Sequence, residues 1–400
     1  MNPDIEKLYT IAAKPQRLII GLMSGTSLDG LDVALCNLQG HGLDTKIELL
    51  QFETVDYKDD FKQAVRSVFS KKQVDLEKLT LLHPWIALQH AATINTLLKK
   101  WNIKTESVDL VASHGQTIYH APKSLHGQQR FGNATLQIGD GDHLAIATGI
   151  ITVSDFRQKH IAAGGEGAPL AVYGDYLIFG KENEDRILLN IGGIANFTYL
   201  PGDRKSTALF STDTGPGNTI MDAYVQERYP GKHFDSNAAI ALQGTINDVL
   251  LNALKENDFF THAFPKTTGP ELFNLEYLQQ AKERSSTQDI SIEDTLATLN
   301  KFTADTIAAA VVQTTGKHKH CAIFSSGGGM HNPLLMQHLQ QLLPACSFST
   351  TASLHINPDA KEAVLFAILA NECIAGDGKY LRQAIDGMPA TAMGKISLPG

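Results

Sequence analysis

The stretch from Leu18 to Leu35, LIIGLMSGTSLDGLDVAL, limits the fold more than any other part of this chain. Two apolar runs of strand length, Leu18–Met23 and Leu31–Leu35, flank a turn of small polar residues, which predicts a β-hairpin. Because glycine has no Cβ, the glycines of this turn let backbone N–H groups approach an anion closely. We therefore expect the tip of the hairpin to bind phosphate.

The predicted tip is not a P-loop, because no lysine precedes its hydroxyl residue. Asp29 would lie beside bound phosphates, where a carboxylate is tolerated mainly when a divalent cation lies between them. Asp29 is therefore a candidate for holding Mg²⁺, through the phosphates or through water. On the turn alone, a structural hairpin with a solvated tip is an equal alternative, since turns of Gly, Ser and Asp are common.

The size and charge of the chain narrow its class. Its 400 residues exceed the roughly 250 to 300 at which one core stops growing, so two domains are expected. With 43% hydrophobic and 19% charged residues the composition is that of a globular protein, and a net charge of −8 argues against nucleic-acid binding. We find neither a signal peptide nor an apolar run of membrane-spanning length, so we expect a cytoplasmic protein without a membrane partner.

The opening hairpin has an echo later in the chain. Arg186–Leu200, RILLNIGGIANFTYL, again places an apolar arm, a glycine tip at Gly192 and Gly193, and a second apolar arm in sequence. The stretches VDLVASHGQT and HCAIFSSGGGMHNP both run from a buried strand into a turn of serine and glycine. These echoes predict two similar α/β halves facing one another.

Asp213 follows a short predicted strand and begins the glycine-rich turn DTGPGN, after which Ile220–Arg228 has a helical pattern. The carboxylate would therefore lie beside a helix N-terminus, where the helix dipole favours anions. An isolated aspartate here would more often cap the helix. A second phosphate-type loop in the same chain favours a functional role instead.

Further polar groups follow other predicted elements. The glycines after Ser326 let a flat ligand such as adenine or ribose lie against the backbone, and Asn332 then opens a helix as its N-cap. Lys266 lies in an exposed loop, KTTG, from which it could reach a substrate. Glu362 lies in the first turn of a C-terminal helix, where it carries either a functional carboxylate or only a favourable interaction with the helix dipole.

Taken together, the opening hairpin and the pieces SHGQT, QIGD, DFR, GGEGAPL, NIGGIANFT, DTGPGN, KTTG and SSGGGMHNP closely resemble the anhydro-N-acetylmuramic acid kinase family, in the family's order from Gly21 to about Gly376. That family belongs to the superfamily of actin, sugar kinases and heat-shock ATPases. The resemblance implies an α/β fold of two RNase-H-like domains with an active-site cleft between them. We expect an N-terminal lobe of residues 1–155 plus 377–400 and a C-terminal lobe of residues 156–376.

The resemblance also implies a reaction. ATP, water and 1,6-anhydro-N-acetylmuramic acid would give ADP and N-acetylmuramic acid 6-phosphate, in the recycling of cell-wall peptidoglycan. Asp213 matches the family's catalytic base and Glu362 an acidic residue near the substrate. One departure is His160, where the usual DFRxxD pattern of the family has aspartate.

The remaining site residues follow from the same matches. We expect ATP and its phosphates to be bound by Gly25, Thr26, Ser27, Leu28, Asp29, Gly30, Leu31, Asp32, Gly192, Gly193, Gly215, Gly217, Asn218, Gly327, Gly328, Gly329 and Asn332. We expect the sugar to be contacted by His114, Gln116, Thr117, Asp155, Arg157 and Lys266.

In the predicted mechanism Asp213 takes a proton from the water that opens the anhydro bridge, and the freed O6 attacks the γ-phosphate of ATP near Mg²⁺. Two alternatives stay open. One is a kinase of the same fold that acts on another sugar. The other is a non-catalytic clamp that responds to ATP, which the retention of Asp213 beside a complete phosphate loop disfavours. A homodimer is expected only because it is the commonest oligomer.

Overall fold

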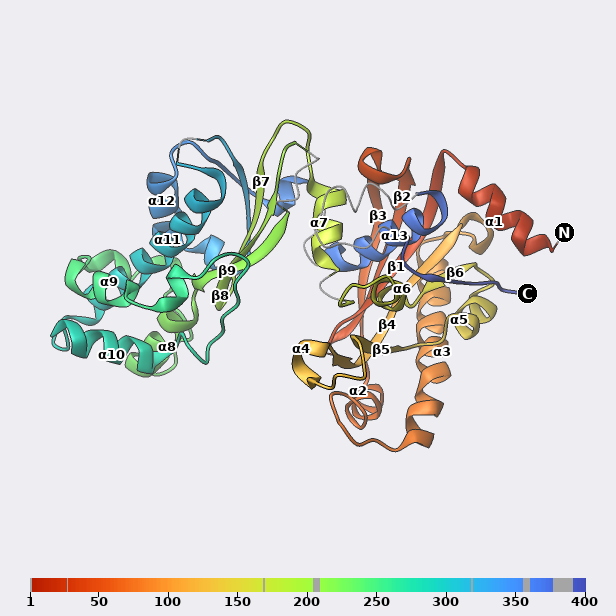
Figure 1. The fold of residues 1–400 in the computed structure, drawn as a ribbon, viewed down its shortest axis with the longest axis horizontal. Coiled ribbons are helices and arrows are strands. Elements are labelled where there is room, and N and C mark those ends of the chain that lie inside the picture. The colour runs from red at the N-terminus through yellow and green to blue at the C-terminus, as the bar shows by residue number, and fades with distance from the viewer. Residues whose placement is uncertain are drawn as a thin grey trace. The chain divides into compact units, whose positions relative to one another are not determined.

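The strands and helices of this chain fall into two units in a computed structural model (Figure 1). The first unit comprises Met1–Phe179 and Ile356–Gly400, and the second comprises Gly180–His355. The structure describes residues 2–26, 28–167, 170–203, 209–317, 319–354, 360–376 and 391–400. Each unit has a central sheet of its own.

The sheet of the first unit is built around the predicted hairpin. Its strands are β1 (Gln16–Ser24), β2 (Gly30–Gln39), β3 (Lys46–Asp56), β4 (Leu110–Ala121), β5 (Ala134–Ile138), β6 (Thr152–Ser154) and β12 (Lys395–Ser397). Strands β1, β2 and β3 form an antiparallel meander, and β4 and then β6 extend it in parallel on the other side of β1. Strands β5 and β12 pair antiparallel with β4 and β6.

The register of β1 against β2 places Ser24 opposite Leu31 at the end of the pair. The residues between them form the connecting turn, so the predicted hairpin is confirmed. Ile19 and Ile20 of β1 point to opposite faces of the sheet and both have no exposed surface. The strand is therefore covered on both faces.

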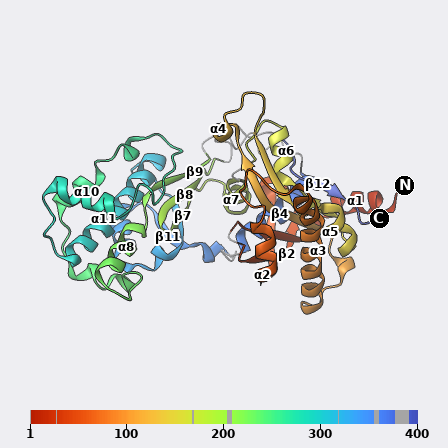
Figure 2. The ribbon, with the colours of Figure 1, turned by 90° about the horizontal axis from the view of Figure 1, so that it is seen from below.

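Helices supply that cover. The helices of the first unit are α1 (Pro3–Ala13), α2 (Asp59–Arg66), α3 (Leu76–Lys100), α4 (Lys123–His126), α5 (Gly141–Thr148), α6 (Phe156–Ala162), α7 (Ala171–Phe179) and α13 (Lys361–Ala375), with short 3₁₀ turns η1 (Gly42–Asp44) and η2 (Thr105–Ser107). Helices α3 and α5 pack together over the face that carries Ile20 (Figure 2). Helix α13 covers the other face, where a Cβ on Gly21 would lie 1.9 Å from the carbonyl oxygen of Ala363.

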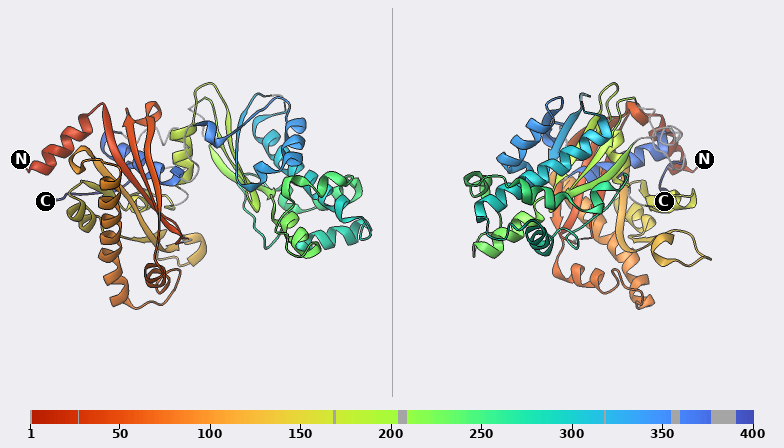
Figure 3. Two further views of the ribbon diagram at one scale, coloured as in Figure 1. Left: turned by 180° about the vertical axis from the view of Figure 1, so that it is seen from behind. Right: turned by 60° about the vertical axis from the view of Figure 1, so that its left-hand side comes forward.

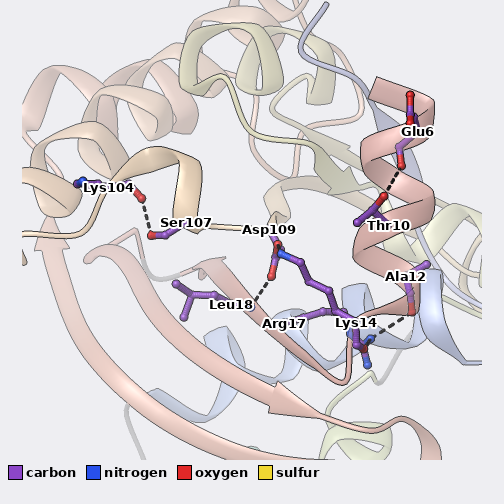
Figure 4. Close-up of polar contacts among 9 residues, drawn as sticks. All are labelled: Glu6, Thr10, Ala12, Lys14, Arg17, Leu18, Lys104, Ser107 and Asp109. Carbon is purple, nitrogen blue, oxygen red and sulfur yellow. Dashed lines mark hydrogen bonds and ion pairs between the residues drawn. The ribbon is translucent and has the colours of Figure 1, made fainter. Parts of the chain in front are cut away.

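Polar contacts fix the start of β1 (Figure 4). The Lys14 ammonium lies 2.5 Å from Asp109, whose second carboxylate oxygen accepts the backbone N–H of Leu18 at 2.9 Å. The buried Arg17 guanidinium donates to the carbonyl of Ala12 and to the side chain of Asn371. These contacts join α1, β1, α13 and the residue that precedes β4, so the end of the hairpin opposite its tip is held firmly.

The second unit has a smaller sheet. Its strands are β7 (Arg186–Ile191), β8 (Ile194–Leu200), β9 (Phe210–Pro216), β10 (Ala322–Ser326) and β11 (Ser347–Thr350). Strands β7, β8 and β9 form an antiparallel meander, and β10 and β11 extend it in parallel beside β7. This order repeats that of the first unit, so the predicted duplication of an RNase-H-like α/β plan is confirmed.

Helices of the second unit gather on the sheet and around a second core. They are α8 (Thr219–Arg228), α9 (Asp248–Lys255), α10 (Leu275–Ser285), α11 (Ile292–Thr315) and α12 (Pro333–Leu342), with 3₁₀ turns η3 (Ser236–Ala238), η4 (Ala241–Gln243), η5 (Asp258–Thr261), η6 (Gly328–His331) and η7 (Thr351–Leu354). Helices α11 and α12 pack on one face of the sheet (Figure 3). The other end of α11 packs with α8, α9 and α10 in a separate apolar cluster.

The division into units differs from the predicted boundaries at residues 155 and 376. Helices α6, α7 and α13 belong to the first unit. Helix α13 is buried on nearly all sides against β1, β2 and β4, and its chain position does not reveal which sheet it covers. In the part of the chain that the structure describes, no helix combines the length and apolar character needed to cross a membrane.

Candidate active site

The hairpin tip of the first unit divides the predicted phosphate residues into exposed and buried groups. Thr26 and Asp29 are exposed and Gly25 is half-buried, whereas Leu28 and Leu31 are 2% and 1% exposed and belong to the core. Leu28 has a positive φ of 60°, which turns its side chain inward beneath the loop. Ser27 lies outside the described residues. Among the described residues of the tip, Thr26, Asp29 and the backbone of Gly25 are therefore available to a ligand.

Gly30 is needed by the protein itself. A Cβ at this position would lie 2.7 Å from the carbonyl oxygen of Val55 on the neighbouring strand β3. This glycine is therefore explained by strand packing, without any ligand. Asp32 lies further along β2, where its carboxylate accepts a 2.6 Å hydrogen bond from the Thr54 hydroxyl.

Gln116, which we expected to contact the sugar, has no exposed surface. Its Oε1 accepts the Ser24 hydroxyl at 2.6 Å, and its Nε2 donates to the carbonyls of Gly25 and Thr117. Both polar atoms of this amide thus contact the protein. In this conformation Gln116 holds the hairpin tip and has no atom left for a ligand.

Arg157 joins two other predicted residues at the end of the same sheet. Its Nε donates a 3.0 Å hydrogen bond to Nε2 of His114, and its Nη1 donates to the carbonyl of Gly167. Burial, followed by the charge of Arg157, lowers the pKa of His114 to about 3, so this imidazole is neutral. An arginine can donate only to an unprotonated nitrogen, which fixes Nε2 of His114 as an acceptor.

Glu362 lies in the first turn of α13, within electrostatic range of Asp32 and Arg157. Burial and the negative charge of Asp32 raise the pKa of Glu362, while Lys361 and Arg157 oppose the shift. The structure therefore brings Glu362, Arg157, His114 and Asp32 together within the first unit. A desolvated carboxylate beside an arginine is a suitable environment for binding sugar hydroxyls.

Asp155, which we expect to contact the sugar, forms an ion pair within the first unit. Its Oδ2 lies 2.5 Å from the ammonium of Lys395 on β12, and its φ is 53°. Thr117 is half-buried, and its hydroxyl accepts the Nε2–H of Gln137. Neither contact involves Arg157 or Glu362.

His160, the departure from the family pattern, is buried, and its Nδ1 accepts the backbone N–H of Gly167 at 2.8 Å. A Cβ on Gly165 would lie 2.1 Å from the His160 ring. Burial, and then the charge of Arg157, lower the pKa of His160. A neutral histidine therefore orders the segment whose Gly167 carbonyl also binds Arg157.

In the second unit, Asp213 lies within β9 and does not cap a helix. The N-cap of α8 is Asn218, so the capping alternative is excluded. The backbone N–H of Thr268 donates to Oδ2 of Asp213 at 2.8 Å, and the N–H of Asp213 donates to the carbonyl of Lys266. Burial raises the pKa of this half-buried carboxyl, and the bond from Thr268 opposes the shift.

The side chain of Lys266 stabilises the loop that contacts Asp213. Its ammonium donates to the carbonyl of Phe259 at 2.8 Å and lies over the rings of Phe259, Phe260 and Phe264, at 4.4 Å from the centroid of the first. Burial lowers its pKa. The side chain that we expected to reach the sugar is therefore occupied within the second unit, where it anchors the loop that contacts Asp213.

A cavity of about 410 Å³ opens beside η6 in the second unit. Three predicted nucleotide residues, Asn218, Gly328 and Asn332, line it. The sequence did not single out the remaining lining residues, which are Met221, Asp222, Phe234, Asp235, Ser236, Asn237 and His331. Apolar side chains, amides and carboxylates together suit a base attached to a ribose.

The predicted glycines of this unit have three different explanations. A Cβ would lie 2.3 Å from the Gly192 carbonyl oxygen at Gly217, 2.7 Å from the Ile191 carbonyl oxygen at Gly327, and 2.3 Å from the Ile191 side chain at Gly329. Those three glycines are required by internal packing. Gly192, Gly193 and Gly328 instead have no atom closer than 3.6 Å to such a Cβ, so their open surface is available to a ligand. Gly215 has a φ of 142°, which favours glycine.

Asp222 is half-buried in the wall of the cavity. Burial raises its pKa to about 6. Both oxygens of the neighbouring Asp235 accept backbone N–H groups of η4 and the residue before it, whereas no such bond reaches the carboxylate of Asp222 from the described residues. Asp222 is therefore a hydrogen-bond acceptor free for a ligand.

The described residues contain no cluster of three or more His, Cys, Asp or Glu side chains that would hold a metal. Magnesium in phosphoryl-transfer enzymes usually keeps several waters and takes one or two carboxylates together with the phosphates. The exposed carboxylate of Asp29 at the hairpin tip fits this mode.

Comparison with known proteins shows the family to which this chain is similar. The sequence model described as anhydro-N-acetylmuramic acid kinase matches residues 17–397. The protein of that name from Pseudoalteromonas atlantica is 58% identical over 400 residues, which are 100% of both chains. The one from Caldanaerobacter subterraneus subsp. tengcongensis is 38% identical, over 98% of this chain and 100% of its own.

Among solved structures, a hexokinase from Schistosoma mansoni complexed with glucose covers 88% of this chain and 85% of its own, at 10% identity and a TM-score of 0.32. That score is too low to carry an argument. The sequence matches carry the assignment, since they extend over nearly the whole chain. The chain belongs to the anhydro-N-acetylmuramic acid kinase family.

Proposed function

We propose that this protein is an ATP-dependent kinase that opens 1,6-anhydro-N-acetylmuramic acid and phosphorylates its O6, giving N-acetylmuramic acid 6-phosphate and ADP. Sequence identities of 58% and 38% to relatives of that name, over 100% and 98% of this chain, support the activity. The observation that carries the mechanism is Asp213, a carboxylate fixed on a strand by the Thr268 N–H and lifted in pKa by burial. The product places the reaction in peptidoglycan recycling.

The reaction joins a hydrolysis to a phosphoryl transfer. A water molecule attacks the anomeric carbon, so a C1–O bond forms while the C1–O6 bond of the anhydro bridge breaks. O6 takes the electron pair and attacks the γ-phosphorus, and the bond from that phosphorus to ADP breaks. One proton of the water has to leave, and a general base must accept it.

We assign that base to Asp213. The Thr268 N–H holds Oδ2, and the described residues form no hydrogen bond to Oδ1, so Oδ1 is free to accept the water proton. Burial raises the pKa of the carboxyl above the usual range of an aspartate, which strengthens it as a base. The three phenylalanine rings around the Lys266 ammonium fix the Lys266 backbone, whose carbonyl accepts the N–H of Asp213.

We assign the nucleoside of ATP to the cavity beside Gly328, with Asp222 accepting hydrogen bonds from ribose hydroxyls or an exocyclic amine. The hairpin tip of the first unit would receive phosphates through Thr26 and the backbone near Gly25. Asp29 would hold Mg²⁺ through water or phosphate oxygens, and the metal would neutralise developing phosphate charge.

We assign the sugar to the polar group of Glu362, Arg157 and His114. A neutral histidine, an arginine and a carboxylate with a raised pKa offer both donors and acceptors to hydroxyl, acetamido and lactyl groups. Unpaired polar groups in such a site penalise sugars that lack a matching partner. Glu362 thereby supplies selectivity for the anhydrosugar.

ADP release in the presence of ATP, Mg²⁺ and 1,6-anhydro-N-acetylmuramic acid tests the function, with N-acetylmuramic acid and glucose as controls. We expect turnover with the anhydrosugar alone and a 6-phosphate product. Turnover with glucose would instead identify a kinase for another sugar. Tight binding of ATP and sugar without any ADP release would identify a non-catalytic clamp.

We further propose that the protein works in the cytoplasm, where ATP is available, as a homodimer, the commonest symmetric assembly. Light scattering coupled to gel filtration measures the oligomeric state, and a monomer mass would reject the dimer. Cell fractionation tests the location.

A further inference from the structure

A buried chain of hydrogen bonds lies beneath the hairpin tip and has no part in the chemistry described above. His90 of α3 contacts the Tyr57 hydroxyl through Nε2 at 3.0 Å. The Tyr57 hydroxyl lies 2.7 Å from Ser24 Oγ, and Ser24 Oγ lies 2.6 Å from Gln116 Oε1. Ser24, His90 and Gln116 are 2%, 1% and 0% exposed, so water does not compete for these bonds.

The direction of every bond in this chain follows from its last member. The Gln116 Nε2 faces two carbonyl oxygens, those of Gly25 and Thr117, so it is the amide nitrogen and Oε1 is an acceptor. Ser24 must then donate to Oε1, and Tyr57 must donate to Ser24. The Tyr57 oxygen can accept in turn only from a protonated Nε2 of His90.

The state of His90 agrees with this direction. Burial lowers its pKa to about 4, so the ring is neutral and carries one N–H. Its Nδ1 is buried without a hydrogen-bond partner, as expected when the proton is on Nε2 and Nδ1 carries only a lone pair. The four side chains therefore form a one-way chain of donors that starts at His90 and ends at Gln116.

Two members of this hydrogen-bonded chain, Gln116 and Tyr57, also donate to backbone carbonyls of the hairpin tip. Gln116 donates to the carbonyl of Gly25 at 3.4 Å, and the backbone N–H of Tyr57 donates to the carbonyl of Asp29 at 3.0 Å. Between these points the side chain of Leu28 is inserted into the apolar cluster that contains Phe61. The Tyr57 ring stacks on Phe61 at 3.8 Å between centroids, which fixes the orientation of its hydroxyl.

Holding the tip in this way has an energetic reason. Leu28 adopts a left-handed φ of 60°, a conformation that is costly for a residue other than glycine and persists only when surrounding contacts hold it. The donor chain and the Leu28 insertion together supply those contacts. Without them the tip would relax, and the backbone groups that face the phosphates would be displaced.

We propose that His90 and Tyr57 are positioning residues that hold the Gly25, Thr26 and Asp29 backbone in the conformation that receives the phosphates of ATP. This inference rests on the phosphate-binding role of the tip in the proposed function. The two residues contact no substrate themselves. Their effect on ATP passes through Ser24 and Gln116.

Two substitutions of His90 separate positioning from packing. In His90→Gln the side-chain amide nitrogen reaches the place of Nε2 and still donates to Tyr57, whereas His90→Leu fills a similar volume with no donor. Tyr57→Phe keeps the stacked ring and removes only the hydroxyl. Tyr199→Phe is the control, because it removes a buried hydroxyl bonded to Asp185 at 3.0 Å in the second unit.

Binding of ATP and of adenosine, each measured by titration calorimetry, reads out the result without requiring turnover. We expect His90→Leu and Tyr57→Phe to weaken ATP binding by roughly ten-fold, the effect of a lost buried hydrogen bond, and to leave adenosine binding unchanged. His90→Gln should restore ATP binding to within about two-fold of wild type, and Tyr199→Phe should not change it.

Equal losses for ATP and adenosine, or equal losses in His90→Gln and His90→Leu, would overturn the inference and leave a structural role. So would unchanged ATP binding in Tyr57→Phe. Failure of the proposed function has a separate signature, which is wild-type protein that binds ATP but releases no ADP with the anhydrosugar. The binding comparison keeps its meaning in that case.

Discussion

The backbone N–H of Thr268 donates a 2.8 Å hydrogen bond to Oδ2 of Asp213, and this contact joins the loop around Lys266 to strand β9. An amide acceptor at position 213 can accept the same bond. Asp213→Asn therefore changes the basicity of the side chain with little change in its geometry.

We predict that Asp213→Asn lowers kcat by roughly 10² to 10⁴, the contribution of a general base, and leaves the dissociation constant for ATP unchanged. The amide can still accept the Thr268 N–H but cannot take a proton from water. ADP release measures kcat, and calorimetry measures ATP binding. Near-normal turnover would show that another group is the base.

We predict that kcat for the anhydrosugar falls at acidic pH, with a midpoint above the pKa of about 4 typical of an aspartate. Burial raises the pKa of Asp213, so the base becomes protonated and inactive at a higher pH than an exposed carboxylate would. Initial rates at saturating substrates between pH 4 and 8 test this. A profile that stays flat down to pH 4 would contradict it.

The sequence predicted features that depend on local pattern. Leu18–Leu35 and Arg186–Leu200 each place a polar or glycine-rich turn between two apolar arms, and the β1–β2 and β7–β8 hairpins follow from these patterns. The glycine-rich turn after Asp213 likewise predicts a strand end, and β9, which contains Asp213, ends at Pro216. The unit to which α13 belongs could not be predicted from the sequence. A helix that is buried on nearly all sides has no polar face to show which sheet it covers.

Individual side-chain roles depend on contacts between distant segments, which the sequence does not reveal. Gln116 and Lys266 stand in motifs that look accessible, but Gln116 pairs with Ser24 and Lys266 enters a ring of phenylalanines. Asp222 was missed because it lies within an ordinary helical pattern. Only folding shows that it lines the cavity beside Gly328.

We predict that Asp222→Asn stabilises the protein at pH 7.5. A carboxyl whose folded pKa is raised to about 6 contributes stability below its unfolded pKa of about 4 and loses it as the pH rises through 6. The gain should be on the order of 1 kcal/mol, well below the roughly 3 kcal/mol of an unscreened shift, because solvent screens a half-buried group. Thermal unfolding at pH 7.5 and pH 4.5 measures it, and the gain should shrink at the lower pH.

We predict that alanine substitutions at two neighbouring glycines affect different properties, ATP binding at one and thermal stability at the other. A methyl group at Gly328 meets nothing closer than 3.9 Å and projects beside the cavity, so Gly328→Ala should keep the melting temperature and raise KM for ATP. Gly327 has a φ of 82°, and its Cβ would lie 2.7 Å from the Ile191 carbonyl, so Gly327→Ala should lower the melting temperature. Unchanged KM in Gly328→Ala would argue against the nucleoside assignment.

We predict that Arg157→Lys raises KM for the anhydrosugar by about ten-fold or more while KM for ATP stays within about two-fold. The guanidinium donates to both His114 Nε2 and the Gly167 carbonyl, and a single ammonium cannot reproduce this fork. His114 is only 3% exposed, so its unpaired Nε2 would also cost stability.

The matched control is Arg186→Lys, which replaces another arginine that donates through Nε, here to Glu184 at 2.7 Å in the second unit. Both variants should lose some thermal stability, but only Arg157→Lys should raise the sugar KM. The difference between them isolates the sugar contact from the general effect of shortening a bonded arginine. If both variants lost stability and neither changed the sugar KM, Arg157 would only support the Gly167 segment, and the sugar assignment would have to move to Glu362 alone.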